Sequence, residues 1–179
     1  MRVCVVGTSG SGKSTLARAI AHKFSIPYIC NDEIILFPRW QPRPKSEIKR
    51  LADEATAVPS WTFDGNIGSS LSDSMVLERA TCLIWLDYPW SVVMRRVILR
   101  TIKRVSTREV LFSQNVEGFR QSFLSRESII YWAATSYGRT QRRYVSLFQQ
   151  LGTTKRLLRL TSPWKTEQWL NRLTPGELR

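Results

Sequence analysis

Residues 7–14, GTSGSGKS, have the types and spacing of a loop that binds phosphate groups. They match G-x-x-x-x-G-K-[ST], in which a glycine-rich turn directs successive backbone N–H groups toward one anion. We expect Lys13 to reach the β- and γ-phosphates of a nucleoside triphosphate and the Ser14 hydroxyl to bind Mg²⁺. The residues expected to contact the nucleotide are Gly7, Ser9, Gly10, Ser11, Gly12, Lys13, Ser14 and Thr15. The sequence therefore predicts a site for ATP and Mg²⁺.

A phosphate loop of this kind needs a carboxylate near the metal, and two predicted strands end on aspartate. Asp64 ends the apolar segment WTFD, and Asp87 ends IWLD. The carboxyl ends of parallel strands face the ligand, so we expect Asp64 to hold Mg²⁺ through water. The alternative for each is a turn or a helix cap, which we favour for Asp87 because Tyr88-Pro89 follows it.

Two more carboxylates, Asp32 and Glu33, follow the predicted strand that ends at Cys30. They lie at the same edge of a parallel sheet and are candidates for holding an acceptor hydroxyl or a metal-bound water. The alternative is that Asn31 or Asp32 caps a helix. The residue pattern leaves both interpretations open.

The charge of the chain is strongly positive, with 27 Lys and Arg against 14 Asp and Glu and a formal net charge of +13. Arg96, Arg100 and Arg104 recur at i, i+4 and i+8, on one face of a predicted helix. Like charges at that spacing repel, and a bound polyphosphate would relieve the repulsion. We expect Arg96 and Arg100 to stabilise the transferring phosphoryl group, whereas the alternative is a solvated basic face.

Apolar runs alternate with helical patterns along the whole chain. Strands are expected over residues 2–6, 26–30, 61–63, 81–86 and 157–160, and helices over 13–24, 45–57, 89–104, 138–151 and 165–173. Because the strands are apolar on both faces, the fold class is α/β, with a central five-stranded parallel sheet flanked by helices in three layers. Together with the phosphate loop after the first strand, this pattern predicts the P-loop NTPase fold.

The length of 179 residues predicts one domain over residues 1–179. The basic segment at about 101–138 is interpreted as a lid or insertion within that domain. The three cysteines, Cys4, Cys30 and Cys82, fit no zinc or redox spacing and are expected to be reduced core residues. No apolar run approaches the roughly 20 residues that a membrane helix requires. No membrane partner is expected, and the expected location is the cytoplasm.

The chain resembles the adenylate-kinase-like nucleoside and nucleotide kinases, and it looks closest to the bacterial topology modulation, or FlaR-like, proteins. Four segments carry the likeness: GTSGSGKSTLAR, CNDEIILFPRW, WTFDGN and IWLDYPWSVVMRRVILR. They occur in order between residue 1 and about residue 104. The resemblance implies a kinase fold with a mobile lid. It also implies that Asp64 lies near the metal and that Arg96 and Arg100 clamp phosphates.

The acceptor half of the site departs from that family. Asn66 stands where adenylate kinases continue F-P-R, so the acceptor-phosphate arginine is absent and an AMP-type acceptor is not favoured. Arg39 or Arg43 is a candidate substitute for that charge. The resemblance places the acceptor near Asp32. The candidates for arginines after the lid are Arg139 and Arg143, with Arg142 as an alternative.

These patterns predict an ATP-dependent, Mg²⁺-requiring phosphotransferase. Its acceptor would be an unidentified nucleoside, nucleotide or other small hydroxyl compound. One alternative is a nucleotide-binding regulator that contacts DNA or RNA through the basic surface, with Trp40, Trp90 and Trp132, which lie outside the predicted strands, stacking on bases. Another is a weak ATPase. No nucleic-acid-binding motif is found in the sequence, and the excess charge gathers where a kinase lid is expected.

Overall fold

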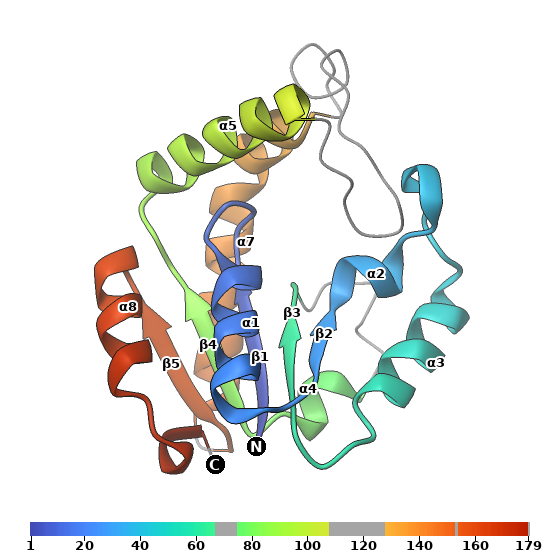
Figure 1. Cartoon of the computed structure of the whole chain (residues 1–179), viewed down its shortest axis with the longest axis vertical. Coiled ribbons are helices and arrows are strands. Elements are labelled where there is room, and N and C mark those ends of the chain that lie inside the picture. The colour runs from blue at the N-terminus through green and yellow to red at the C-terminus, as the bar shows by residue number, and fades with distance from the viewer. Residues whose placement is uncertain (67–74, 108–127, 153, 179) are drawn as a thin grey trace.

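The computed structural model describes residues 1–66, 75–107, 128–152 and 154–178. Five parallel strands form one sheet in the order β2-β3-β1-β4-β5 (Figure 1). The strands are β1 (Arg2–Gly7), β2 (Tyr28–Cys30), β3 (Trp61–Asp64), β4 (Cys82–Leu86) and β5 (Arg156–Leu160). The first strand of the chain is the central one, so the loop that follows it emerges in the middle of the carboxyl edge.

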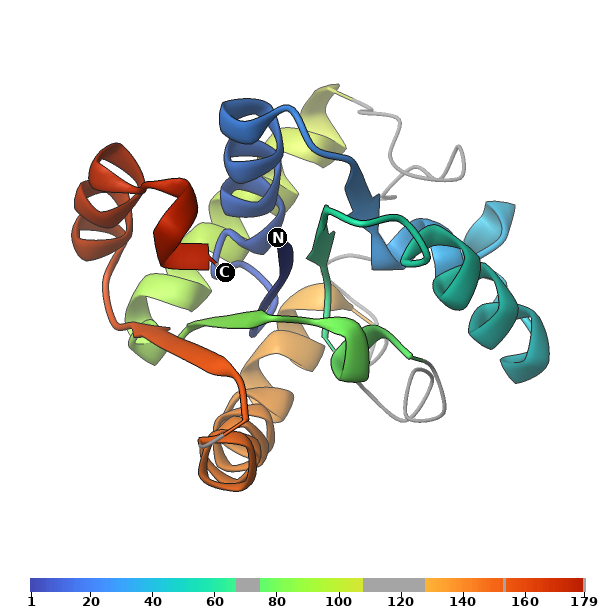
Figure 2. The same ribbon diagram turned by 90° about the horizontal axis from the view of Figure 1, so that it is seen from below.

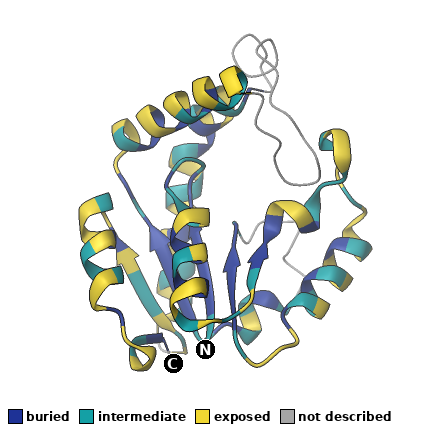
Figure 3. Ribbon diagram, viewed as in Figure 1, coloured by how far each residue is buried: buried dark blue, intermediate teal, exposed yellow. Residues whose placement is uncertain are grey.

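The three inner strands are buried because helices cover both faces of the sheet. Every residue of β3 and β4 is buried, and β1 is buried from Val3 to Gly7. Uninterrupted apolar strands of this kind are typical of parallel sheets. The edge strand β5 is buried only at Leu160 among its five residues. Figure 3 shows this contrast between the buried strands and the exposed outer faces of the helices.

Seven α-helices lie within the described residues. They are α1 (Lys13–Phe24), α2 (Asn31–Ile35), α3 (Lys45–Ala55), α4 (Val76–Arg79), α5 (Trp90–Thr107), α7 (Ile129–Leu151) and α8 (Pro163–Arg172), with short 3₁₀ turns at Pro38–Trp40 and Pro175–Leu178. Viewed from below, α1 and α8 lie on one side of the sheet, and α4 and α7 lie on the other (Figure 2). These layers confirm the predicted three-layer α/β fold.

Two apolar clusters fill the space between the layers. The first joins α1, α5 and α8 to one face of the sheet through residues that include Leu16, Val97 and Leu170. The second joins α3, α4 and α7 to the other face through residues that include Ala52 and Tyr144. Burial on both faces holds the carboxyl edge of the strands in a fixed position.

Helix α5 lies across the carboxyl end of the sheet rather than against one of its faces (Figure 1). It packs on the loop that follows β1, where a Cβ built on Gly10 would lie 2.4 Å from Val97 Cγ2 and 3.0 Å from the Val93 carbonyl oxygen. The helix therefore covers the predicted phosphate loop directly.

The predicted helix 13–24 has the bounds that the structure shows, whereas other bounds differ. Helix α7 begins at Ile129, nine residues before the expected start at residue 138. Ser128 explains the earlier start because its side chain accepts a hydrogen bond from the Tyr131 N–H and caps the helix. The short helix α4 was not predicted, since four residues are too few to show a helical period. Helix α2 begins where one interpretation expected a helix, but its N-cap is Cys30, so neither Asn31 nor Asp32 is the cap.

The predicted lid at residues 101–138 is described only at its two ends, which continue α5 and α7. Residues 108–127 lie outside the described part of the chain, so the lid stays a prediction. Among the described residues, no helix has the length and apolar character needed to cross a membrane.

Candidate functional site

Three glycines give the loop after β1 a shape that other residues would not adopt. Gly7, Gly10 and Gly12 have φ angles of 148°, 82° and 96°. Gly7 is also closely confined, because a Cβ there would lie 2.7 Å from the Leu86 carbonyl oxygen. The Ser11 hydroxyl donates to the Thr8 carbonyl oxygen at 2.8 Å and closes the turn. The loop therefore has the compact form that a phosphate cradle requires.

Helix α1 begins directly after this loop with its N-terminus open. Gly12 is the N-cap in a left-handed conformation, and no side chain caps the helix. The first-turn N–H groups of a helix favour an anion, and the positive end of the helix dipole adds to that preference. Ser14 and Thr15 lie exposed in this first turn. These features fit the phosphates of a nucleotide.

Three cationic side chains converge on the loop. Lys13 Nζ donates to the Thr8 carbonyl oxygen at 3.0 Å. From α5, Arg96 Nη1 donates to the Ser11 carbonyl oxygen at 3.2 Å, and Arg100 Nη2 donates to Ser9 Oγ at 3.3 Å. Arg96 also lies over the Tyr88 ring, with Cζ 5.4 Å from the ring centroid. The structure thus brings together the lysine and the two arginines that the sequence singled out.

Asp64 lies at the carboxyl end of β3 and is 5% exposed. Its Oδ2 accepts a hydrogen bond of 2.9 Å from the Tyr28 hydroxyl of β2. Burial and the neighbouring Asp64 carboxylate raise the pKa of Tyr28, so the phenol stays protonated and keeps donating. Arg18 lies over the Tyr28 ring, with Cζ 5.0 Å from its centroid. One oxygen of Asp64 is therefore held, which orients the other.

The charges at this edge interact across three elements. Burial lowers the pKa of Lys13, and the charges of Asp64 and Asp32 oppose that effect. Loss of hydration raises the pKa of Asp32, although its side chain keeps contact with solvent; the charge of Lys13 opposes this rise. Arg100 and Arg104 also lower the pKa of Asp32, which places that carboxylate within electrostatic range of α5. Asp32 therefore belongs to the same cluster as Lys13 and Asp64.

Asn66 joins the loop to helix α7. Its Oδ1 accepts a hydrogen bond of 3.2 Å from the Gly7 N–H and one of 2.8 Å from the Tyr144 hydroxyl. Tyr144 is 1% exposed, and its ring packs beside Trp85 with centroids 5.8 Å apart. The oxygen of this acceptor-site candidate is thus engaged by the phosphate loop.

The remaining acceptor candidates lie on and after α2. Glu33 is exposed in the first turn of that helix. Arg39 is exposed with a left-handed φ of 61°. Arg43 is held by Glu47, at 2.7 Å between Nη1 and Oε1, and by stacking on the Phe37 ring at 4.0 Å. Arg43 is therefore committed to local structure, whereas Arg39 and Glu33 face solvent.

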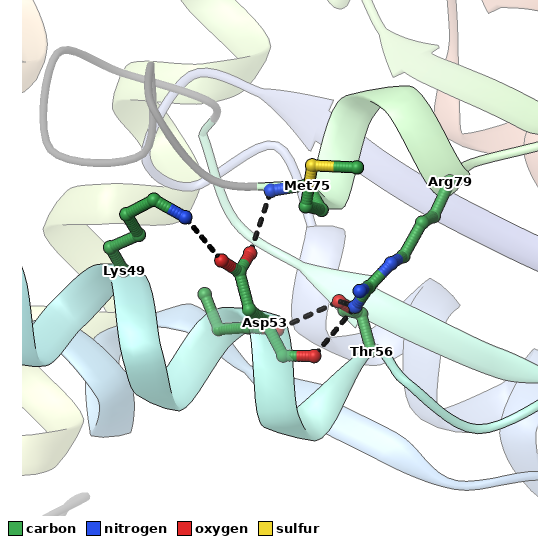
Figure 4. Close-up of polar contacts among 6 residues, drawn as sticks. Lys49, Asp53, Thr56, Met75 and Arg79 are labelled. Carbon is green, nitrogen blue, oxygen red and sulfur yellow. Dashed lines mark hydrogen bonds and ion pairs between the residues drawn. The ribbon is translucent and has the colours of Figure 1, made fainter.

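Arg79, the first arginine after the D-G-N segment, is a structural residue. Its Nη1 donates to the Asp53 carbonyl oxygen at 2.6 Å and to Thr56 Oγ1 at 3.1 Å. The Asp53 carboxylate accepts from Lys49 and from the Met75 N–H, so helix α3 is tied to the start of α4 (Figure 4). These bonds commit Arg79 to the link between α3 and α4.

Two further elements of the predicted site lie on α7 and at the end of β4. Arg139 and Arg143 are both exposed on α7, one helical turn apart. The sequence favoured a turn or helix cap for Asp87, but its side chain bonds instead to Arg159 of β5 and Gln141 of α7. Its Oδ2 accepts from Arg159, at 2.8 Å from Nε and 2.5 Å from Nη2, and its Oδ1 accepts from Gln141 at 3.3 Å.

The residues fit a bound Mg²⁺ that shares its ligands with phosphate and water. Ser14 offers a hydroxyl, and Asp64 offers the carboxylate oxygen that Tyr28 leaves available. No group of three or more His, Cys, Asp and Glu side chains that could hold a metal occurs among the described residues. Mg²⁺ usually keeps several waters and binds one or two carboxylates plus substrate phosphates, so Ser14 and Asp64 are the residues that would hold it.

Sequence reasoning did not single out Tyr28 and Tyr144. Tyr28 precedes the Ile29-Cys30 end of a strand, and only the strand order shows that β2 lies beside β3 and brings it to Asp64. Tyr144 lies 78 residues after Asn66, and nothing in its surroundings distinguishes it from a core tyrosine. Both contacts depend on tertiary structure.

Comparisons with known proteins point to kinases. No protein-family model matches the chain. A shikimate kinase from Sulfurihydrogenibium sp. (strain YO3AOP1) is 22% identical over 142 residues, which cover 71% of this chain and 81% of that protein. An adenylate kinase from Clostridium botulinum (strain Loch Maree / Type A3) is 36% identical over 73 residues, which cover 40% of this chain and 34% of that protein.

The fold is shared with a solved kinase. The crystal structure of shikimate kinase from Bacteroides thetaiotaomicron aligns with a TM-score of 0.54 at 15% identity, covering 96% of this chain and 95% of that chain. This chain therefore has a three-layer α/β P-loop NTPase fold and is similar to P-loop kinases. The narrower resemblance to topology modulation proteins stays a prediction.

Proposed function

We propose that this protein is an Mg²⁺-dependent kinase that transfers the γ-phosphoryl group of ATP to a hydroxyl of a small acceptor. One observation carries the proposal: the ammonium of Lys13 and the guanidinium groups of Arg96 and Arg100 all contact loop residues 8–11. Three like charges at one loop repel each other unless an anion lies between them. A polyphosphate is the anion that such a cluster fits.

When bound, ATP·Mg²⁺ would supply the phosphoryl group and an electrophilic centre. Lys13, Ser14 and the open N-terminus of α1 would hold the phosphates and the metal. Arg96 and Arg100 would neutralise negative charge on the transferring group, in a position already fixed by their contacts with the loop. Asp64, oriented by Tyr28, would hold a metal-bound water. Catalysis would rest on positioning and electrostatics.

Asp32 is the candidate for accepting the proton of the acceptor hydroxyl. Its raised pKa brings it closer to the range that suits a general base, and its electrostatic interactions with Lys13 and Arg100 support a role near the transferring group. Glu33, exposed in the same turn, is the second carboxylate available to an acceptor.

The residues around Asp32 and Glu33 favour an acceptor without a phosphate group. Arg43 and Arg79 are committed to Glu47 and to the α3–α4 link, and residues 67–74 contain neither Lys nor Arg. The carboxylates of Asp32 and Glu33 would repel a second phosphate. We therefore propose a hydroxyl compound, such as a nucleoside or polyol, in preference to a nucleoside monophosphate.

A screen of nucleosides, nucleoside monophosphates and small polyols for ADP release with Mg-ATP tests this function. Lys13→Ala should lower the rate with the best acceptor about 10- to 150-fold, since hydrogen bonds to charged groups contribute about 1.5–3 kcal/mol. Lys23→Ala is the matched control, because Lys23 lies near the other end of α1 and bonds to α8 at Leu170. Unchanged turnover in Lys13→Ala would refute the role of the loop.

The screen also separates the alternatives. A rate that is equal with and without every acceptor would indicate a weak ATPase. Faster turnover with nucleoside monophosphates than with nucleosides or polyols would contradict the proposed acceptor class. Contact with DNA or RNA and a cytoplasmic location stay predictions from charge and composition.

A further inference from the structure

The first N–H of the phosphate loop is held by a side chain rather than by the backbone of the neighbouring strand. Strands β1 and β3 pair in parallel up to Val5 and Asp64, and the Gly65 N–H donates to the Val5 carbonyl oxygen at 3.2 Å. In a longer parallel ladder a backbone carbonyl of β3 would accept the next N–H, that of Gly7. Here Asn66 Oδ1 accepts it instead, at 3.2 Å.

Tyr144 fixes the position of that oxygen. Its hydroxyl lies 2.8 Å from Asn66 Oδ1, and its ring is buried in the core beside Trp85. A backbone N–H can only donate, so the atom of the Asn66 amide facing Gly7 is the oxygen, and Tyr144 donates to the same oxygen. The amide therefore has a single orientation that satisfies both partners.

We propose that Asn66 and Tyr144 are positioning residues that hold Gly7, and with it the phosphate loop, in the form that binds a nucleotide. No side chain can anchor this position, because a Cβ built on Gly7 would lie 2.7 Å from the Leu86 carbonyl oxygen. On the β4 side Gly7 is in register with Leu86, and on the β3 side the hydrogen bond that holds its N–H is the one to Asn66. Through Tyr144 and Asn66, helix α7, which carries Arg139 and Arg143, is also tied to the loop.

The proposal rests on the proposed use of the loop for ATP, and its test measures affinity rather than turnover. The dissociation constant of Mg-ATP is measured by titration calorimetry for the wild type, Tyr144→Phe, Asn66→Ala and the double variant. Tyr137→Phe is the matched control, because Tyr137 lies on the same helix and donates one hydrogen bond of 2.9 Å to the Tyr88 carbonyl oxygen, away from Gly7.

Tyr144→Phe should weaken Mg-ATP binding about fivefold and Asn66→Ala about tenfold or more, in line with about 1 kcal/mol for each lost hydrogen bond. In the Asn66→Ala background, Tyr144→Phe should have little further effect, because the tyrosine acts through the asparagine. Tyr137→Phe should leave the dissociation constant within twofold of the wild type.

Denaturant unfolding of each variant separates positioning from general stability. A Tyr144→Phe protein that is less stable but binds Mg-ATP as tightly as the wild type would overturn the proposal, as would effects of the two substitutions that simply add. If the wild type itself does not bind Mg-ATP, the proposed function fails first, and the positioning role fails with it.

Discussion

Gly10→Ala tests whether helix α5 packs on the phosphate loop as described. Gly10 has a φ of 82°, and an alanine Cβ would lie 2.4 Å from Val97 Cγ2. The left-handed conformation costs an alanine about 1 kcal/mol, and forcing a methyl group into a filled site costs about 1–3 kcal/mol. We therefore expect Gly10→Ala to lower the free energy of unfolding by about 2–4 kcal/mol, measured by urea denaturation.

Val97→Ala provides the partner for a double-mutant cycle, because it removes the atom that the new methyl group would strike. Val97 is fully buried, so this change alone should also destabilise the protein. The two changes together should cost at least about 0.5 kcal/mol less than the sum of the single changes. Additivity within about 0.3 kcal/mol would show that the loop and α5 are not in contact. Gly138→Ala is the control, and it should raise the free energy of unfolding rather than lower it. Nothing lies within 4 Å of a Cβ built at this position in helix α7, so alanine should stabilise the helix by up to about 1 kcal/mol.

Three further predictions concern the carboxyl ends of β2 and β3. Gly65→Ala should destabilise the protein by more than about 2 kcal/mol in urea denaturation, because the φ of 154° is strained for alanine and its Cβ would lie 2.2 Å from that of Asn31; a wild-type midpoint would contradict this packing. Tyr28→Phe should raise the Mg²⁺ concentration needed for half-maximal turnover several-fold, because Asp64 loses the donor that orients it; an unchanged Mg²⁺ dependence would remove that role. Asp32→Asn should raise the melting temperature at pH 7: the raised pKa means that the folded state holds the proton more tightly than the unfolded state, so wild-type stability falls as the pH rises above the ordinary value of 3.8. The difference in melting temperature should shrink as the pH falls toward 3.8, and a pH-independent difference would contradict the assignment.

The sequence predicted the fold class and the convergence of Lys13, Arg96 and Arg100 on one loop because both depend on local patterns. The apolar run before Gly7 and the helical period after Gly12 define a strand, a loop and a helix without any long-range information. The spacing of Arg96 and Arg100 likewise places them on one helix face. That face meets the loop because α5 crosses the carboxyl edge of the sheet.

The acceptor half was less predictable because its contacts join residues far apart in the chain. Asn66 was a candidate for contacting the acceptor, but its bonds to Gly7 and Tyr144 appear only when β3, β1 and α7 are brought together. Arg43 was likewise a candidate for supplying a missing charge. Its pairing with Glu47 joins the chain just before α3 to the first turn of that helix, and it competes with any ligand for the guanidinium.

The central claim is that Lys13, Arg96 and Arg100, which meet at the loop after β1, bind ATP for phosphoryl transfer. Titration calorimetry of the wild type and Arg100→Ala with Mg-ATP, followed by ADP release with the best acceptor, tests it most directly. We expect the wild type to bind Mg-ATP and to release ADP faster with a hydroxyl acceptor than without one, and Arg100→Ala to lower that rate at saturating ATP. A wild-type protein that binds no Mg-ATP, or an Arg100→Ala variant with wild-type turnover, would contradict the account.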